Sequence, residues 1–179
     1  MMTSSDAVNS LSEKIHPACL DHELLLKDCQ IQNVRRSGPG GQHRNKVETG
    51  VVIKHHPTKI LGEASEKRQQ GRNRSVALFR LRINLALQHR IHEIPKSASN
   101  LWQRRIYNGT IKANSEHDDF PALLAEAMDT LAYYQFDLKQ ASEYLKCSAS
   151  QLIKFLKKEP RAFALLNQKR NDLGLHALK

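Results

Sequence analysis

The residues of this chain best suited to chemistry lie in one glycine-rich segment, residues 37–42, which reads Ser-Gly-Pro-Gly-Gly-Gln. Glycine-rich loops often bind phosphate, but a Walker loop ends in Gly-Lys-Ser/Thr and a dinucleotide loop has the spacing Gly-x-Gly-x-x-Gly. The segment has neither pattern, and the nearest lysine, Lys46, lacks the hydroxyl neighbour that would hold magnesium. Three glycines and a proline at such close spacing predict a loop whose backbone visits unusual angles.

Patterns typical of strands and of one long helix surround this loop. Residues 30–36 alternate weakly and predict a strand before the loop. After it, the β-branched run 51–55 and residues 60–64 predict two further strands joined by a short turn, as in a hairpin. From Ser65 as the N-cap to about His92, apolar residues recur at helical spacing and predict a long helix that also carries arginines.

The loop and its surroundings resemble a known family. Residues 36–45 read Arg-Ser-Gly-Pro-Gly-Gly-Gln-His-Arg-Asn, which resembles the loop of the class I peptide chain release factors. The pair Asn45-Lys46 is similar to the codon-independent rescue members of that family. The resemblance runs from about Gln30 to Arg90 and includes residues 66–77, similar to the basic stretch that follows the two strands in the family. It implies a domain built around a Gly-Gly-Gln loop, with no cofactor.

The family's reaction is the hydrolysis of the ester in peptidyl-tRNA, with water as the attacking group. A fixed backbone N–H that stabilises the oxyanion of the tetrahedral intermediate is worth roughly 3 kcal/mol. Gly40 and Gly41 add almost no bulk and can adopt positive φ, so the amide of Gln42 can face the reacting centre. The resemblance implies that this amide stabilises the oxyanion and that the Gln42 side chain limits the nucleophile to water.

Two further groups of residues are expected to serve this loop. Arg44 and residues 47–50 depart from the residues usual in the family, and Arg44 would either contact phosphate or adapt the loop to another RNA. The residues expected to shape and anchor the loop are Ser37, Gly38, Pro39, His43, Asn45 and Lys46. The residues expected to contact RNA are Arg35, Arg36, Arg44, Arg68, Arg72 and Arg74.

The net charge of +10 is distributed unevenly. Positions 1–115 hold 19 Lys/Arg against 9 Asp/Glu, whereas positions 116–179 hold 9 of each. A basic field confined to one part of a chain suits a partner with a dense phosphate backbone. The planar guanidinium of arginine binds phosphate well, so the abundance of arginine favours RNA over a merely solubilising surface.

The sequence predicts an α+β fold in which a small mixed β-sheet and a long basic helix precede an all-helical C-terminal module. The expected division is a partly helical N-terminal segment 1–28, a catalytic domain 29–96, a polar connector 97–119 and a helical module 120–179. Residues 137–156 resemble a helix-turn-helix unit, and their balanced charge favours packing or docking of a protein over DNA reading. Trp102, in the connector, either stacks on an RNA base or anchors on the core.

The sequence bears none of the marks of a membrane, secreted or metal-binding protein. It has no long apolar run, no secretory signal and no Cys-x-x-Cys, so we expect a soluble cytoplasmic protein without a metal site. Fewer than forty residues precede the loop and leave no room for a codon-recognition region. We therefore predict a monomeric, codon-independent peptidyl-tRNA hydrolase that acts at the peptidyl-transferase centre of the large subunit and contacts rRNA and peptidyl-tRNA. The alternative is a non-catalytic factor that binds the ribosome or RNA with the same scaffold.

Overall fold

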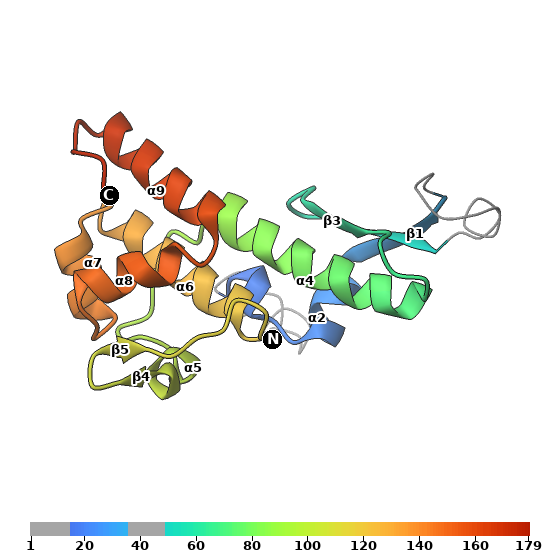
Figure 1. Ribbon diagram of the computed structural model, residues 1–179, viewed down its shortest axis with the longest axis horizontal. Helices are drawn as coiled ribbons and strands as arrows, with labels where there is room; N and C mark the ends of the chain where they lie inside the picture. The colour runs from blue at the N-terminus through green and yellow to red at the C-terminus, as the bar shows by residue number, and fades with distance from the viewer. Residues whose placement is uncertain (1–14, 36–48) are drawn as a thin grey trace, which may run out of the picture.

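A computed structural model describes residues 15–35 and 49–179 of the chain. A long central helix, α4, carries a small sheet towards one end and packs against a group of shorter helices towards the other (Figure 1). The strands are β1 Cys29–Val34, β2 Gly50–His55, β3 Leu61–Ala64, β4 Ile106–Tyr107 and β5 Thr110–Ile111. The helices are η1 Pro17–Cys19, α2 His22–Lys27, α4 Gln70–Gln88, α5 Asn100–Arg105, α6 Phe120–Tyr133, α7 Leu138–Tyr144, α8 Ala149–Leu156 and α9 Pro160–Asp172.

The three strands around the loop form one sheet in the order β1-β2-β3. Their bounds agree with the predicted strands to within one or two residues at each end, and the α+β class with a helical C-terminal region is confirmed. The sheet was expected to be mixed, but both of its strand pairs are antiparallel. Strands that follow one another through hairpin connections pair in this way, whereas parallel pairing would need a long crossover.

Helix α4 covers β2 and β3 and leaves β1 largely open to solvent. The closest approach is at Gly62 of β3, where an added Cβ would lie 2.3 Å from the carbonyl oxygen of Ala77 and from the nitrogen of Leu81. Any side chain at this position would force the strand away from the helix, so the contact requires glycine. Val51 and Ile53 of β2 are buried in the same core.

The long helix is shorter than the predicted span from Ser65 to about His92. It begins at Gln70 because the preceding residues are held in a non-helical turn by the side chain of Asn73. It ends at Gln88, where the Arg90 guanidinium donates to the carbonyl oxygens of Ala86 and Leu87. Side-chain bonds to the main chain thus replace the next turn at each end.

The C-terminal helices share one apolar core with the rest of the described chain. Helix α6 packs on α4 and on η1, while α7 and α8 follow as the predicted helix-turn-helix pair. Asp137 and Ser148 cap α7 and α8 through side-chain oxygens, as residues of these types commonly do. Pro160 occupies the first turn of α9, where its missing N–H costs nothing.

The segment expected to be a polar connector contains ordered elements. Helix α5 leads into the β4–β5 hairpin, which turns at Asn108 and Gly109 with φ of 46° and 70° as the Asn-Gly pair predicts. Trp102 of α5 is fully buried, and its indole N–H donates to the carbonyl oxygen of Leu145 at 2.8 Å. Of its two expected roles, the structure therefore shows the core anchor. No helix among residues 15–35 and 49–179 is long and apolar enough to cross a membrane.

Candidate functional site

The described residues place the two ends of the predicted loop side by side. Val34, the last residue of β1, is the Cα partner of Gly50, the first residue of β2. The chain between them therefore leaves the sheet and returns to it at neighbouring positions, at the end of the sheet next to the start of α4 (Figure 1). The following expected site residues lie outside the described residues: Arg36, Ser37, Gly38, Pro39, Gly40, Gly41, Gln42, His43, Arg44, Asn45 and Lys46.

Gly50 closes the base of the loop at a position with no room for a side chain. An added Cβ would lie 2.8 Å from the carbonyl oxygen of Val34, 2.9 Å from a Val34 methyl carbon and 3.3 Å from the Cβ of Ser65. Since two of these distances are shorter than real Cβ contacts, a larger residue would push β1 and β2 apart. This glycine keeps the two ends of the loop at strand-pairing distance.

Asn73, in the first turns of α4, ties the base of the loop to the helix. Its side chain is completely buried, and its amide nitrogen donates to the carbonyl oxygens of Thr49 at 2.7 Å and Lys67 at 2.9 Å. Its carbonyl oxygen accepts from the backbone N–H of Lys67 at 2.8 Å. Both hydrogens of the amide are thus used, and one side chain joins three segments: the end of the loop, the turn 65–69 and the helix.

A second tie connects the same turn to the middle of α4. The Arg80 guanidinium donates to the Glu66 carboxylate at 2.7 Å and to the carbonyl oxygen of Glu63 at 2.8 Å. Slight burial opposes ionisation of Glu66, but the backbone N–H groups of Glu66 and Ser65, together with Arg80, hold the pKa of this carboxyl below its ordinary value. The pair is half exposed and contributes little to the free energy of folding on its own. Its effect is to fix the turn that leads into α4.

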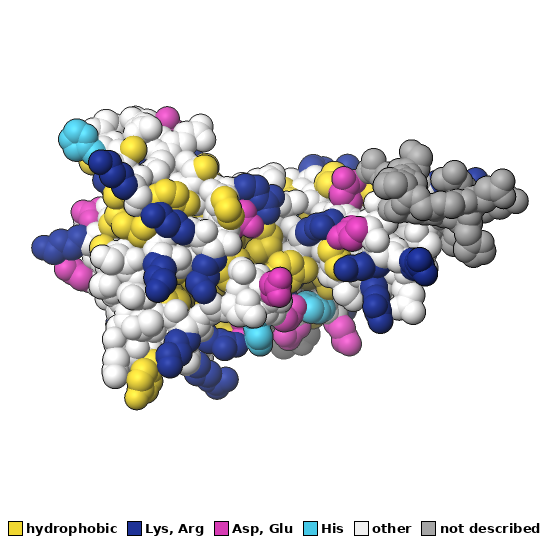
Figure 2. Space-filling view, viewed as in Figure 1, with side chains coloured by type: hydrophobic (Ala, Val, Ile, Leu, Met, Phe, Trp, Pro, Cys, Tyr) yellow, Lys and Arg dark blue, Asp and Glu magenta, His cyan; other side chains and the backbone are white. Residues whose placement is uncertain are grey.

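Four of the arginines expected to contact RNA are described, and all four side chains are exposed: Arg35, Arg68, Arg72 and Arg74. Within residues 15–35 and 49–179, the side chains of Arg68, Arg72 and Arg74 make no hydrogen bond or ion pair, so their guanidinium groups face solvent. Figure 2 shows Lys and Arg side chains gathered over the sheet end of α4, beside the residues drawn in grey. This end of the molecule can therefore receive phosphate groups close to where the loop leaves the sheet.

Two arginines that follow this basic stretch, Arg82 and Arg90, serve the fold instead. Arg82 is buried and donates to the Asp118 carboxylate at 2.9 Å, and Arg90 donates to Asp129 at 3.0 Å. The count of arginines in the sequence therefore overstates the surface available to RNA.

The sequence alone did not assign roles to Gly50 and Asn73. A signal existed for Asn73, because asparagine is a poor helix former whose side chain readily bonds to the main chain. For Gly50 the signal was ambiguous, since a glycine before a β-branched run fits a turn as well as a strand.

Comparison with known proteins gives matches that centre on the same region. The family described as the RF-1 domain matches residues 19–119. The peptide chain release factor 1-like, mitochondrial, protein of Mus musculus is 40% identical over 110 residues, which are 60% of this chain and 28% of that protein. Peptide chain release factor 1 of Dictyoglomus thermophilum is 38% identical over 91 residues, which are 51% of this chain and 24% of that protein.

A third relative, peptide chain release factor 2 of Sulfurovum sp., is 41% identical over 66 residues, or 37% of this chain and 18% of that protein. The chain thus spans less than a third of the length of each of these three relatives. No solved structure matches the chain.

Proposed function

The chain belongs to the class I peptide chain release factor family, and from this premise we propose that it is a codon-independent peptidyl-tRNA hydrolase that rescues stalled ribosomes. The observation that carries the proposal is the Gly-Gly-Gln sequence at residues 40–42, located between the paired ends of β1 and β2 inside the matched region. The aligned region is about a quarter of the mouse relative, so the proposal concerns only what this region does.

In the proposed reaction, water attacks the ester carbonyl that joins the nascent peptide to tRNA. The carbonyl oxygen becomes an oxyanion, and the backbone N–H of Gln42 donates to it, which lowers the barrier by roughly 3 kcal/mol. Collapse of the intermediate breaks the bond to the ribose oxygen, which takes up the proton lost by the attacking water, and releases the peptide with a free carboxyl group. Gly40 and Gly41 keep the tip of the loop small, while Gln42 excludes nucleophiles larger than water. The remaining loop residues would shape the loop, as the sequence predicts for Ser37, Gly38, Pro39, His43, Asn45 and Lys46.

The proposed partners are the peptidyl-transferase centre of the large subunit, its rRNA and the peptidyl-tRNA. Exposed Arg68, Arg72 and Arg74 support this, because they are cations without a partner in the described chain and lie in the turn and first turns of α4 that Asn73 ties to the end of the loop. Arg35, Arg36 and Arg44 would extend the same surface. A monomer in the cytoplasm is proposed, although the mouse relative is named as mitochondrial. The helices within residues 120–179 remain a proposed packing or docking module.

The test is release of labelled formyl-methionine from ribosomes that carry initiator tRNA, with and without a codon in the A site. We expect release without a stop codon, and we expect Gly41→Ala, which crowds the tip of the loop and misplaces the amide of Gln42, to reduce its rate by at least a hundredfold. Gln42→Ala keeps the backbone N–H, so its expected effect is the loss of selectivity for water: it should accept nucleophiles larger than water, such as hydroxylamine, which the wild type excludes. Binding to ribosomes without any release would contradict the hydrolase and favour the non-catalytic binding factor. Release only with a stop codon would contradict codon independence.

Two variants in the described chain serve as matched controls. Gln168→Ala removes an exposed glutamine from α9. Gly71→Ala adds a methyl group at a helical position with nothing within 4 Å of the new Cβ. Both variants should release peptide at the wild-type rate, and Gly71→Ala should gain about 0.5–1 kcal/mol in the free energy of unfolding. A loss of activity in either control would show that the assay reports general damage to the protein.

A further inference from the structure

The β4–β5 hairpin and helix α8 form one surface that carries several cations and an exposed tyrosine. Residues 103–113 hold three Lys/Arg and residues 144–158 hold four, and neither segment contains an acidic residue. The two segments lie side by side, because the ammonium group of Lys158, just after α8, donates to the carbonyl oxygen of Ala113, just after β5, at 2.6 Å. Figure 2 shows Lys and Arg side chains over both segments on the same face. We define the hairpin–α8 surface as Arg104, Tyr107, Lys112, Lys154 and Lys158.

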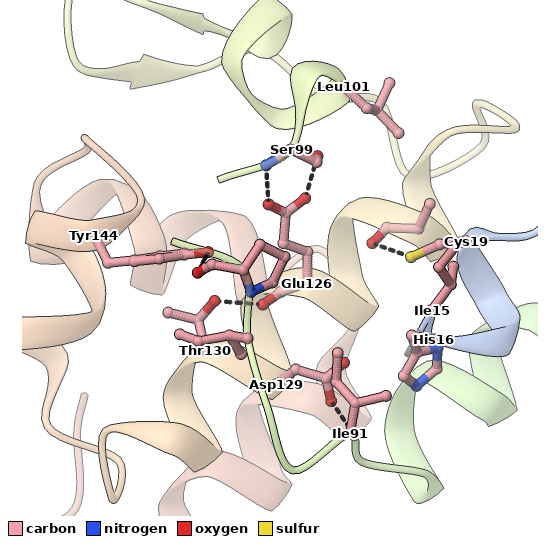
Figure 3. Close-up of a pocket in the computed structure, with 13 residues that line it drawn as sticks. Ile15, His16, Cys19, Ile91, Ser99, Leu101, Glu126, Asp129, Thr130 and Tyr144 are labelled. Carbon is pink, nitrogen blue, oxygen red and sulfur yellow. Dashed lines mark hydrogen bonds between the residues drawn. The ribbon is translucent and has the colours of Figure 1, made fainter. Parts of the chain in front are cut away.

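The two acids of α6 do not neutralise this surface, because their side chains are turned inwards. Glu126 and Asp129 lie beside a cavity of about 300 Å³ between α6, η1 and residues 91–101 (Figure 3). The Glu126 carboxylate accepts from the N–H and the hydroxyl of Ser99 at 2.6 and 2.5 Å, and Asp129 accepts from Arg90 at 3.0 Å. Both carboxylates are therefore occupied inside the fold.

Most cations of the hairpin–α8 surface have no acidic partner. The acids Asp119 and Glu159, which flank the two segments, are each paired with an arginine outside this surface. The side chains of Arg104, Lys112 and Lys154 are exposed and form no hydrogen bond or ion pair with any residue of 15–35 and 49–179. Like charges held together repel one another, so such a surface favours a partner with several negative charges.

Tyr107 adds a flat aromatic ring to these cations. The residue is 64% exposed, and the ammonium group of Lys112 lies 4.9 Å from the centre of its ring. Lys112 is two positions beyond Thr110, the cross-strand partner of Tyr107, so the two side chains are diagonal neighbours on one face of the hairpin. With so much of the residue exposed, the ring can receive a second planar group.

The hairpin holds this ring in a fixed position. Ile111 is buried on the opposite face of the hairpin, and the N–H of Lys112 donates to the carbonyl oxygen of Arg105 at 2.8 Å, which extends the pairing of β4 and β5. Helix α5, which leads into the hairpin, is anchored by the buried Trp102. A partner that stacks on Tyr107 therefore does not have to order the chain that carries it.

We infer that the hairpin–α8 surface binds single-stranded RNA, with one base stacked on Tyr107 and phosphate groups bound by the surrounding cations. Proteins hold unpaired nucleic acid by this combination of an aromatic ring for a base and cations for the backbone. A duplex keeps its bases stacked on one another and has none to offer the ring. An acidic peptide would satisfy the cations but leave the ring unused.

This surface would be a second RNA contact, separate from the arginines near the loop. It lies towards the end of α4 remote from the base of the loop (Figure 1). Helix α4, with 19 residues, spans about 28 Å, so a single RNA phosphate cannot reach both places. That the bound RNA is ribosomal rests on the proposed function, whereas the binding of single-stranded RNA rests on the surface alone.

The test is the fluorescence anisotropy of a short labelled oligouridylate, titrated with the full chain in which Arg68, Arg72 and Arg74 are replaced by alanine. This triple variant lacks the cations near the loop, and we expect it to bind the oligouridylate saturably. In this background Tyr107→Ala should weaken binding at least fivefold, whereas Tyr107→Phe, which keeps the ring, should change it less than twofold. Tyr133→Ala, which removes a comparably exposed tyrosine from α6, is the matched control and should also change it less than twofold.

The phosphate contacts are tested by salt dependence in the same background. Replacing both Lys112 and Lys154 by alanine should reduce the slope of log K against log salt concentration by about 1.4, the value for two phosphate contacts on a single strand. Lys139→Ala, on the exposed face of α7, is the control and should leave the slope unchanged. The melting temperature verifies that each variant is folded, and Tyr107→Leu replaces Tyr107→Ala if the latter does not fold.

The inference would be overturned by an absence of saturable binding in the triple variant, by equal effects of Tyr107→Ala and Tyr133→Ala, or by an unchanged salt slope. Tighter binding of an RNA or DNA duplex would also overturn it, as would tighter binding of polyglutamate, which would indicate an acidic protein as the partner. None of these measurements depends on peptide release. Gly41→Ala should bind the oligouridylate as the wild type does, so the RNA surface and the proposed hydrolase can fail separately.

Discussion

Replacement of Asn73 by alanine should destabilise the fold and slow peptide release together. The substitution removes three buried hydrogen bonds of 2.7, 2.8 and 2.9 Å, to the carbonyl of Thr49 and to the N–H and carbonyl of Lys67. At about 1 kcal/mol net for each bond, the free energy of unfolding should fall by about 3 kcal/mol. In a chain of this length that loss lowers the melting temperature by about 10 °C.

The slower release follows from the position of Thr49 at the end of the loop. Without the amide of Asn73, the loop keeps its strand pairing at Gly50 but loses its tie to α4. Small misplacements of a catalytic group are costly, so we expect the rate of single-turnover release to fall at least tenfold. Urea titration gives the stability, and the release assay is run at a temperature at which the variant is fully folded.

Asn84→Ala is the matched control for this prediction. Asn84 lies on the same helix, donates to the carbonyl oxygen of Leu61 at 2.8 Å and accepts from the exposed Arg161 guanidinium at 2.9 Å, but it is only partly buried and does not contact the loop base. Loss of these two bonds should cost about 1–2 kcal/mol, because the one to Arg161 is exposed, and should change release less than twofold. Asn73→Asp keeps the shape of the side chain but turns an acceptor towards two carbonyl oxygens, so it should be at least as harmful as alanine. A folded Asn73→Ala or Asn73→Asp protein that releases peptide at the wild-type rate would refute the reasoning.

Three further predictions concern the loop base, the RNA surface and the pH dependence of stability. Gly50→Ala, whose Cβ would lie 2.8 Å from the carbonyl oxygen of Val34, should lower the free energy of unfolding by about 1–3 kcal/mol in urea titrations. Gly71→Ala should raise it by about 0.5–1 kcal/mol, and equal losses in the two variants would contradict the packing argument. Arg72→Ala should change the free energy of unfolding by less than about 0.5 kcal/mol. It should also reduce the slope of log K against log salt concentration for ribosome binding by about one, the value for one phosphate contact, and an unchanged slope would exclude this contact. Burial lowers the pKa of His16 from 6.5 to about 3, so between these pH values the unfolded chain binds a proton that the folded chain does not. The free energy of unfolding therefore decreases as the pH falls from 6.5 towards 3. His16→Asn should therefore flatten the loss of stability between pH 6.5 and 4 by up to about 1.4 kcal/mol per pH unit, and an identical slope in both proteins would refute the assignment.

The sequence predicted those helices and strands whose signals lie within a few residues of one another. The strands and the C-terminal helices follow from β-branched runs, apolar spacing and caps such as Ser148, because each of these signals acts within a few residues. The start of α4 could not be predicted in this way. Ser65 is a good N-cap by type, but the turn after it is fixed by Asn73 and Arg80, whose partners are known only once the helix lies on the sheet.

The same limit applies to the charge of the C-terminal region. Equal numbers of acidic and basic residues in positions 116–179 suggest a neutral surface. The structure buries two of these acids, Glu126 and Asp129, beside the cavity of α6, and it uses Asp118 and Asp119 in pairs with arginines of the preceding region. A count along the chain cannot register such pairing, because the partners come from elements distant in sequence.

The arginines of α4 show how one basic helix serves two purposes. Towards its C-terminal end Arg82, and just beyond that end Arg90, reach carboxylates of the following region and hold η1 and α6 in place. Near its N-terminal end, Arg72 and Arg74 have no such partners in the described chain and remain in solvent. Among the described arginines of α4, those without a partner thus lie only where the helix is beside the ends of β1 and β2. A surface that merely kept the protein soluble would not need this separation, whereas a domain that brings its loop into RNA requires its cations at the loop and its neutralised charges behind it.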